Sequence, residues 1–531
     1  MNTLAELLAL PLRTCPDAVA IRTHGQQISF ETIERKARAL SEILISEYGM
    51  ESADRIIVLA DKRPSIVVSA YAIWKAGCIY VPVDIKSPQL RLQHIISSIR
   101  PRLIIAGRRL LTDLARAIDS VPALTFEDIE ANSACGANAV LPVVTDDEPA
   151  MIIHTSGSTG TPKGVVLTHK SVITYFNNHN EYLKFETGSV GMNNGPFHFD
   201  VSIQDTFLPL YFGSAVVFHG DIFLSSIMID LILKNRVTHL IAVSSVLDLI
   251  SRDSIKFNAL QQSNLRVVVT GGEVCPPGLI NRWLETVPGL RVLYGYGPTE
   301  CNSLCFTFEI REPDTHRDAP YPIGSPFRGM RAALFDDAGN IIPQPQRIGV
   351  LGIAGPQLMM GYWNDPEMTR RVMRPIGGDT YYITGDYCMC DSQGTFSFIG
   401  RTDSEVKIRG RRINLNEVRN AMMSHPGVSY AAVGTVEIRG EVRIAAFVVA
   451  EEGLVSYQDL HHAADSRLLD YMRPYYIGMM SMPPRTATGK INEKLALEAL
   501  RESILRNSAA RELRLATSTA EAAKTVAEPA A

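Results

Sequence analysis

A run of glycines, hydroxyl residues and one lysine, His154–Gly164, is the segment whose composition points most directly to chemistry. It holds three glycines, five hydroxyl side chains and Lys163 between two short apolar runs, Ala150–Ile153 and Val165–Leu167, which are typical of buried strands. Glycine lets a backbone approach a ligand and turn its amides inward. A flexible linker is the alternative, but a linker needs no flanking core strands. The segment therefore predicts a polyphosphate-binding loop, although its glycine spacing is not that of a Walker A loop.

Other segments combine turn-forming residues with charged or aromatic side chains. Tyr296, Thr299 and Glu300 lie on a Gly/Pro loop, Asp386 follows a predicted strand, and Lys490 ends a second hydroxyl-and-lysine loop. Each has a structural explanation when taken alone. Asp386 could form a turn, Glu300 could stabilise a helix N-terminus, and Lys490 could be a solvated surface lysine.

The elements that must position these residues alternate short apolar strands with helices between about residues 55 and 300. We predict strands at 55–60, 103–106, 215–218, 239–243 and 265–270, and helices at 65–75 and 222–234. This alternation favours an α/β fold with largely parallel sheets. From about 320 to 400, short strands with Gly/Pro/Asp turns indicate a β-rich subregion.

A chain of 531 residues is too long for one hydrophobic core. A boundary is predicted near Gly400–Asp403, followed by a helix from Asn416 and strands at 430–435 and 444–449. We therefore expect a large N-terminal domain of layered sheets over 1–402 and a small, mobile α+β domain over 403–505. Residues 506–531 contain few large apolar side chains, which favours a frayed helix or a disordered tail.

Composition and charge exclude several classes of protein. The formal charge of −4 disfavours nucleic-acid binding. No apolar stretch approaches the length of a membrane span, and the N-terminus has no basic region of a signal peptide. Eight cysteines in a chain of this size are not a disulfide framework. We expect a cytoplasmic protein with no membrane partner.

Taken together and in this order, the segments resemble the adenylate-forming superfamily, which includes acyl-CoA synthetases, luciferases and the adenylation domains of nonribosomal peptide synthetases. The resemblance extends from roughly residue 10 to residue 500. It implies an enzyme that uses ATP and Mg²⁺ to convert a carboxylic acid into an acyl adenylate.

The resemblance also implies a role for each matching residue. The phosphates of ATP would be held by Thr155, Ser156, Gly157, Ser158, Thr159, Gly160 and Lys163. Adenine would lie between Tyr296 and the segment Gly271, Gly272 and Glu273. Thr299 would contact the α-phosphate, Glu300 would bind Mg²⁺, and Asp386 with Arg401 would hold the ribose. Lys490 would reach the carboxylate and the α-phosphate, and Asp403 matches the hinge of the small domain.

The segment 195–204 indicates the substrate class. In the amino-acid-activating branch, an aspartate at the position of Asp200 pairs with the substrate α-ammonium, although Asp200 could instead cap the helix that follows it. His198 would shape the pocket. The other pocket positions would be Val201, Gln204, Ile241, Val269, Gly271, Gly295, Ser303 and Leu304. The set Asp-Val-Gln resembles proline activators, whereas the two glycines argue for a deeper pocket. All these positions are uncharged, which favours a neutral amino acid.

The acceptor is expected to be a separate carrier protein with a phosphopantetheine arm. No carrier-protein segment follows residue 500, so the chain resembles a freestanding enzyme. One departure from the family pattern lies at Arg412–Val418, where Asn414 replaces a glutamate and Asn416 replaces a glycine near the approach of the pantetheine arm. The adenylation step is therefore better supported by the sequence than the thioester-forming step.

Other activities fit parts of the same pattern. A D-alanine–carrier protein ligase or a ligase that passes the adenylate to an amine would use the same residues. A carboxylic acid–CoA ligase would not need Asp200. A non-catalytic nucleotide-binding scaffold descended from the family would have no use for Lys163, Glu300, Asp386 and Lys490. We therefore favour an amino acid–carrier protein ligase.

Overall fold

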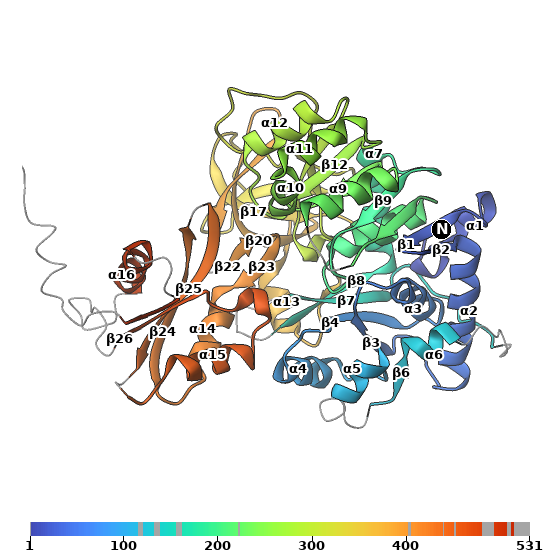
Figure 1. The fold of residues 1–531 in the computed structure, drawn as a ribbon, viewed down its shortest axis with the longest axis horizontal. Coiled ribbons are helices and arrows are strands. Elements are labelled where there is room, and N and C mark those ends of the chain that lie inside the picture. The colour runs from blue at the N-terminus through green and yellow to red at the C-terminus, as the bar shows by residue number, and fades with distance from the viewer. Residues whose placement is uncertain are drawn as a thin grey trace, which may run out of the picture.

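The computed structural model describes residues 2–114, 121–131, 139–155, 162–220, 224–401, 405–438, 440–450, 453–480, 493–506 and 511–514. It confirms the predicted α/β fold with a large N-terminal and a small C-terminal domain. Figure 1 shows the large domain in blue to yellow and the small domain, in orange and red, packed against one side of it. None of the described helices combines the length and apolarity needed to cross a membrane.

The sheet that carries the predicted phosphate loop is covered on both faces. Ile56 and Val58 point into one core cluster, which includes helix α3 (Pro64–Lys75). Ile57 and Leu59 point into another, which includes helix α4 (Gln89–Ile99). Burial on both faces explains why its strands read as continuous apolar runs. The strand order is β18-β8-β7-β4-β3-β5-β6, with bounds Gly361–Tyr362, Lys163–Thr168, Pro149–Thr155, Ile79–Asp84, Arg55–Ala60, Leu103–Ala106 and Ala123–Thr125.

Two further sheets complete the α/β part of the large domain. One has the order β2-β1-β10-β9, and the other has the order β11-β12-β13-β14-β15. The first sheet consists of Gln26–Ser29, Val19–Thr23, Ala215–Phe218 and Val190–Asn193. The second consists of His239–Ile241, Val267–Gly271, Arg291–Tyr296, Phe306–Ile310 and Ser325–Pro326.

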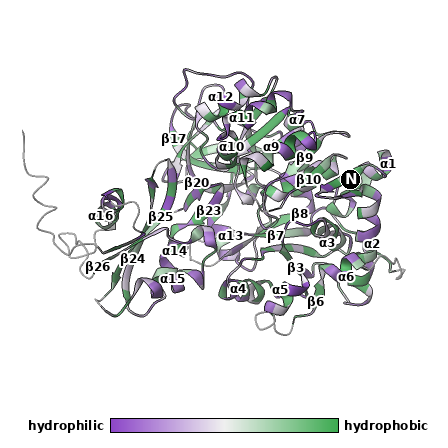
Figure 2. Ribbon diagram, viewed as in Figure 1, coloured by the Kyte–Doolittle hydropathy of each residue, from purple (hydrophilic) through white to green (hydrophobic). Residues whose placement is uncertain are grey.

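Helices cover these sheets, and their polarity follows their position. Helix α3 is buried along almost its whole length and is apolar on all sides, whereas α13 is hydrophilic (Figure 2). The helices of the large domain are α1 (Ala9–Thr14), α2 (Phe30–Ser46), α3 (Pro64–Lys75), α4 (Gln89–Ile99), α5 (Arg108–Asp113), α6 (Phe126–Ala131), α7 (His169–Leu183), α8 (Leu208–Tyr211), α9 (Ser225–Lys234), α10 (Ser244–Ser251), α11 (Ser254–Phe257), α12 (Pro277–Thr286) and α13 (Pro366–Val372).

The predicted β-rich subregion is an antiparallel sheet. Strands β16 (Arg331–Phe335), β17 (Ile348–Ala354), β20 (Asp379–Cys390) and β19 (Met373–Ile376) follow one another across it, and β21 (Phe396–Arg401) pairs with β20. The pairing places Asp386 opposite Arg401. Two residues that lie 15 positions apart in the sequence are thereby brought side by side.

The small domain has its own core on both faces of one sheet. Strands β24 (Val428–Ile438), β25 (Glu441–Ala450), β26 (Tyr476–Met480) and β27 (Glu512–Arg514) form this sheet. Helices α14 (Leu415–Met423) and α15 (Tyr457–Asp465) cover one face, and α16 (Glu493–Arg506) covers the other. A separate hairpin, β22 (Glu405–Ile408) and β23 (Arg411–Asn414), reaches toward the large domain (Figure 1).

The structure differs from the sequence prediction at the tail. Within 506–531, expected to be frayed or disordered, Glu512–Arg514 forms strand β27 and pairs in parallel with β26. Leu513 is buried against the small-domain core. One apolar side chain and a free sheet edge are sufficient for this pairing, and composition alone does not reveal them. Residues 507–510 and 515–531 lie outside the described part of the chain.

Candidate active site

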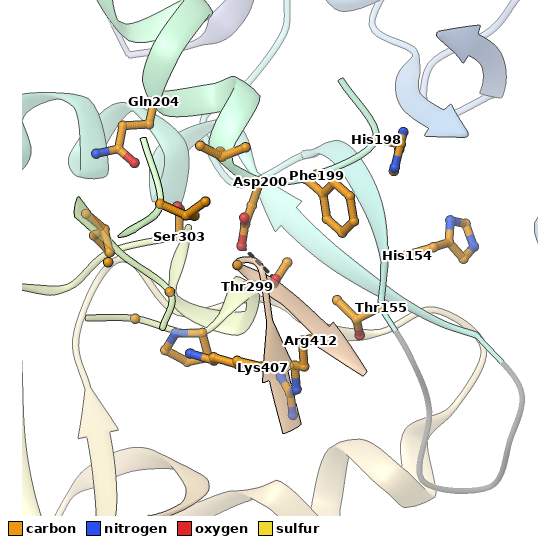
Figure 3. A pocket seen from close by; sticks show the side chains of 18 of the residues that line it. His154, Thr155, His198, Phe199, Asp200, Gln204, Thr299, Ser303, Lys407 and Arg412 are labelled. Atoms are coloured by element: carbon orange, nitrogen blue, oxygen red, sulfur yellow. Dashed lines mark hydrogen bonds between the residues drawn. The ribbon is translucent and has the colours of Figure 1, made fainter. Parts of the chain in front are cut away.

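One pocket at the junction of the two domains contains most of the residues that the sequence pattern selects (Figure 3). The predicted substrate residues on its wall are His198, Asp200, Val201, Gln204, Ile241, Val269, Gly271, Ser303 and Leu304. The predicted nucleotide residues on the same wall are Thr155, Gly272, Thr299, Asp386 and Arg401. The small domain closes the pocket with Lys407, Gly410, Arg412, Leu469 and Tyr471. The fold thus brings the two predicted sets into one cavity.

The remaining described residues of the predicted site lie beside the pocket and contact its wall. They are Lys163, Glu273, Gly295, Tyr296 and Glu300, and each contacts a residue of the pocket lining or a partner of one. Ser156, Gly157, Ser158, Thr159, Gly160, Asp403 and Lys490 lie outside the described residues, so their predicted roles stay predictions.

Asp200 presents its carboxylate to the pocket. Thr299 Oγ1 donates a hydrogen bond to Asp200 Oδ2 at 2.6 Å, and Figure 3 shows both side chains pointing into the cavity. Burial raises the pKa of the Asp200 carboxyl, while the Thr299 hydroxyl and the charge of Lys407 act in the opposite direction. Within the described part of the chain, no cation lies within ion-pair distance of this carboxylate. An approaching ammonium would therefore find an acceptor whose charge is only partly compensated.

Local hydrogen bonds fix the segment that carries Asp200. The buried Asp205 carboxylate accepts the backbone N–H groups of Asn194 and Gly195 at 2.8 and 2.7 Å. Asp205 lies in a π-helical turn, Ile203–Phe207, and such turns frequently occur at functional sites. The Asp205 contacts tie residues 194–195 to this turn, and Asp200 lies between them.

Neither pocket glycine leaves open space beside it, although their missing side chains argued for a deeper pocket. A Cβ on Gly271 would lie 2.3 Å from the carbonyl oxygen of Gly295, and a Cβ on Gly295 would lie 2.6 Å from Leu304 Cδ1. The space that the missing side chains leave is filled by the neighbouring strand and by a leucine. Both glycines therefore allow close packing instead of opening a cavity.

We expect Gly271→Ala to lower the free energy of unfolding by about 1–3 kcal/mol, because the added methyl overpacks a strand against a backbone oxygen. Gly278→Ala is the matched control, since a Cβ there meets nothing within 4 Å. It lies in helix α12, where alanine should stabilise by about 0.5–1 kcal/mol. Thermal melts of both variants test this. Equal melting temperatures of Gly271→Ala and Gly278→Ala would contradict the packing role of Gly271.

His198 is neutral in this environment. Burial lowers its pKa to about 4, and Asp84, whose Oδ2 lies 3.5 Å from His198 Nε2, acts in the opposite direction. Neither ring nitrogen has a hydrogen-bond partner among the described residues. The position on the pocket wall agrees with a role in shaping the cavity.

Glu300 lies at the centre of a buried charge cluster. Tyr362 Oη donates to its Oε1 at 2.7 Å, Lys163 Nζ lies 3.3 Å away, and Arg412 Nη1 lies 3.2 and 3.0 Å from its two oxygens. Burial alone would raise the pKa of the Glu300 carboxyl, but the charges of Arg412 and Lys163 lower it well below its ordinary value. Glu300 is therefore ionised. One carboxylate beside a lysine that is predicted to bind phosphate fits the usual Mg²⁺ site, in which substrate phosphates supply the other anionic ligands.

A second charge cluster surrounds Asp386. Tyr296 donates its hydroxyl to Asp386 Oδ2, and Arg401 contacts Asp386 Oδ1. Arg401 also donates to Glu405 at 2.8 Å. Lys407 Nζ lies 5.5 Å from the centre of the Tyr296 ring. The aromatic face that the family resemblance assigns to adenine is thus near a cation of the small domain.

The small domain enters the site through the turn of hairpin β22–β23. The backbone N–H of Gly410 donates to Glu273 Oε2 at 3.0 Å. Gly410 has φ +73, and a Cβ there would lie 2.3 Å from Val243 Cγ1, so glycine is required at this contact. Farther along, Arg91 of α4 forms a buried ion pair with Glu417 of α14.

The departure from the family pattern at Asn414 has a structural explanation. Asn414 is the N-cap of helix α14, and its Oδ1 accepts the backbone N–H of Asn416 at 2.9 Å. Asparagine is among the preferred N-cap residues. The helix that presents Glu417 to Arg91 therefore begins at a stabilising cap.

Sequence reasoning missed Lys407, Arg412 and Arg91 as site residues. Lys407 and Arg412 are direct partners across the hairpin, so both side chains lie on the face that enters the pocket (Figure 3). Alternation of charged and apolar residues in 405–414 could have placed the two cations on one face. No local pattern indicates that this face meets Glu300.

The comparisons with known proteins agree with this geometry. Residues 11–363 match the model of the family described as AMP-binding enzyme, and residues 417–490 match the AMP-binding enzyme C-terminal domain. The chain belongs to the AMP-binding enzyme family. Membership implies that this AMP-binding enzyme uses ATP to adenylate a substrate acid.

Similar proteins are found among relatives in sequence and among solved structures. The chain is 29% identical to L-proline–[L-prolyl-carrier protein] ligase of Streptomyces coelicolor, with 89% of this chain and 92% of the relative covered. It is also 29% identical to tyrocidine synthase 3 of Brevibacillus parabrevis, with 93% of this chain but only 7% of that protein covered. The structure of PA1221, an NRPS protein containing adenylation and PCP domains, shares the fold at TM-score 0.81 and 24% identity, covering 93% of this chain and 84% of that one.

Proposed function

We propose that this AMP-binding enzyme activates a small, neutral amino acid as its aminoacyl adenylate and transfers it to the phosphopantetheine thiol of a carrier protein. The observation that carries the proposal is the partly buried Asp200 carboxylate on the pocket wall, hydrogen-bonded to Thr299. A buried ammonium needs a partner charge, and Asp200 supplies one. The relative that ligates L-proline to a carrier protein supports the same class of substrate.

Apart from Asp200 and His198, the predicted substrate wall consists of uncharged residues, which supports a neutral side chain. Gln204 and Ser303 are its polar members, and Gln204 Nε2 is buried with no hydrogen-bond partner among the described residues. Val201, Ile241, Val269 and Leu304 supply apolar surface. Because neighbouring atoms fill the space beside both glycines, we favour a small amino acid as the substrate.

The first half-reaction needs positive charge more than a base. A carboxylate is already ionised at pH 7, so its oxygen can attack the α-phosphorus directly while the bond to pyrophosphate breaks. In our proposal, Lys163 holds the leaving phosphates, Thr299 lies next to the α-phosphate, and Asp386 with Arg401 positions the ribose. A Mg²⁺ ion at Glu300 would offset charge on the phosphates.

The second half-reaction exchanges the acyl group. The thiol sulfur attacks the carbonyl carbon, the carbon–oxygen bond to AMP breaks, and AMP leaves as the thiol loses its proton. The entry of hairpin β22–β23 into the pocket supports a role of the observed orientation in this step, because Gly410 there allows close backbone approach.

An exchange assay tests the proposal most directly. Exchange of radiolabelled pyrophosphate into ATP should depend on a small, neutral amino acid from a panel of proteinogenic amino acids and D-alanine. The matched acids without the amino group should give no exchange. Equal exchange with those acids would overturn amino acid activation and favour a carboxylic acid–CoA ligase. Supplying the activated amino acid with a holo-carrier protein, CoA or an amine then identifies the acceptor.

The buried pair Arg91–Glu417 provides a prediction for the second step. Glu417→Gln leaves the Arg91 charge buried without its partner, at a cost of about 3–5 kcal/mol, and destabilises this orientation of the small domain. We expect carrier loading to fall roughly tenfold or more, with pyrophosphate exchange retained. Glu441→Gln is the control, because Glu441 pairs only within the small domain in the described contacts. Equal losses of carrier loading and pyrophosphate exchange in Glu417→Gln would contradict a role of the Arg91–Glu417 pair in this orientation alone.

A further inference from the structure

One of the two cations paired with Glu300 comes from the other domain. Glu300 is fully buried in the large domain, and Arg412 reaches it from strand β23 of the small-domain hairpin. Arg412 Nη1 contacts both carboxylate oxygens, at 3.2 and 3.0 Å. Its Nε also donates to Glu405 on the paired strand at 2.5 Å. This second contact helps to hold the guanidinium in position.

The ion pairs linked to Glu300 and Asp386 contain as many carboxylates as cations. Glu300, Glu405 and Asp386 supply three negative charges, and Lys163, Arg401 and Arg412 supply three positive ones. A divalent cation bound to the same carboxylate oxygens would lie at close range to the Arg412 guanidinium. Repulsion between cations is strong in a buried, low-dielectric site. Arg412 contacts both oxygens that a divalent ion would need, so the guanidinium and the ion disfavour one another at Glu300.

We propose that Arg412 and Mg²⁺ compete for the Glu300 carboxylate, so that the hairpin enters the site only after the metal has left. The inference rests on the proposed function, in which Glu300 binds the metal of the ATP complex. Withdrawing the hairpin removes Arg412 and Glu405 together, which leaves the Glu300 carboxylate facing the place of the phosphates. Arg412 is thus a positioning residue that replaces the metal charge once pyrophosphate and metal have gone.

The same contact makes the competition reciprocal. If hairpin entry weakens metal binding by some factor, metal binding weakens hairpin entry by the same factor. Lys163 completes the arrangement, because its ammonium lies against Glu300 and Tyr362 in this orientation. It would leave Glu300 to hold phosphates in the other orientation. Two groups that serve the triphosphate thus interact with each other when the hairpin is in place.

Metal affinity measured without turnover tests this inference. Mn²⁺ binding in the presence of α,β-methylene-ATP, which cannot release pyrophosphate, is followed by electron paramagnetic resonance on the full chain. Arg412→Gln should tighten Mn²⁺ binding by about fivefold or more, within the usual range of coupled sites. Arg443→Gln is the control, since Arg443 pairs with Glu441 inside the small domain and should leave the affinity unchanged. Glu300→Gln should weaken Mn²⁺ binding.

Hydrogen exchange of the wild-type protein provides a second readout. Backbone amides of the hairpin, including that of Gly410, should lose protection when Mg²⁺ and the analogue are added together. They should keep it with the analogue and a chelator. This readout does not depend on how the Arg412 variant folds.

The outcomes distinguish failure of the competition between Arg412 and Mg²⁺ from failure of the proposed function. If Glu300→Gln weakens Mn²⁺ binding but Arg412→Gln leaves it within twofold of wild type and hairpin protection is unchanged by metal, the competition is wrong and the proposed function stands. If Glu300→Gln leaves Mn²⁺ affinity unchanged, the metal role of Glu300 fails, and the competition fails with it. Neither measurement uses the amino acid or the carrier, so failure of those assignments would be detected only by the exchange panel.

Discussion

Replacing Asp200 by asparagine is expected to lower kcat/KM for the native amino acid by about two to four powers of ten. The substrate ammonium would be buried without its partner charge, at a cost of about 3–5 kcal/mol. The amide keeps the size of the carboxylate and can still accept the hydrogen bond from Thr299. The variant should also discriminate less against the acid that lacks the amino group. Pyrophosphate exchange with both acids measures this change in preference.

The fold of the same variant should be intact. Burial raises the pKa of the Asp200 carboxyl above 3.8, so the ionised form is less stable in the folded than in the unfolded chain. The protonated carboxyl stabilises the fold below the pKa of the unfolded chain. This stabilisation is lost as the pH rises from the unfolded pKa to the folded one, and at pH 7 the ionisation of Asp200 lowers the free energy of unfolding. Asparagine removes this cost, so the melting temperature should not fall.

Asp205→Asn is the matched control for a buried aspartate that does not line the pocket. Asp205 accepts two backbone N–H groups, so its loss should lower the melting temperature without changing the preference for the amino acid. An Asp200 variant that kept the wild-type preference would return Asp200 to the role of a helix cap.

The part of the site that could be predicted from the sequence is the part made by local segments. Asp200 and Gln204 lie four residues apart on one segment, and Thr299 lies on a Gly/Pro loop after a strand. Their position depends on short-range turns and hydrogen bonds that sequence patterns record. The strands and helices of the α/β layers were predictable for the same reason, because burial on both faces leaves continuous apolar runs.

The contacts between domains could not be predicted in this way. Arg412 meets Glu300 across 112 positions, and Arg91 meets Glu417 across 326. Each of these residues is one charged side chain among many, and most charged side chains are exposed to solvent. Only the three-dimensional packing decides which charges are buried together. Gly295 was misread for a related reason, because its missing side chain makes room for Leu304, a packing relation that spacing does not encode.

These interdomain contacts bear on which cations act in each half-reaction. Lys407 and Arg412 enter the pocket with the hairpin, and both lie close to the residues that the family resemblance assigns to the nucleotide. Burial lowers the pKa of Lys407, and Asp386 acts in the opposite direction. A site already supplied with these two charges does not need the charge of Lys490 in the same orientation. Lys490 should therefore act in adenylation alone.

Lys490→Ala should consequently lower the kcat of adenylation by on the order of a hundredfold or more, because the lost charge would act mainly on the transition state. Lys490 lies outside the described residues, and its role rests on the pattern Pro484–Lys490. Thioester formation from supplied aminoacyl adenylate should stay within about twofold of wild type, since that step would use the hairpin contacts. Both half-reactions are measured on one preparation, beside Glu417→Gln, for which the opposite pattern is expected. Equal loss of both half-reactions in Lys490→Ala would contradict a role of Lys490 in adenylation alone. Full retention of adenylation would contradict any role of this lysine in that step.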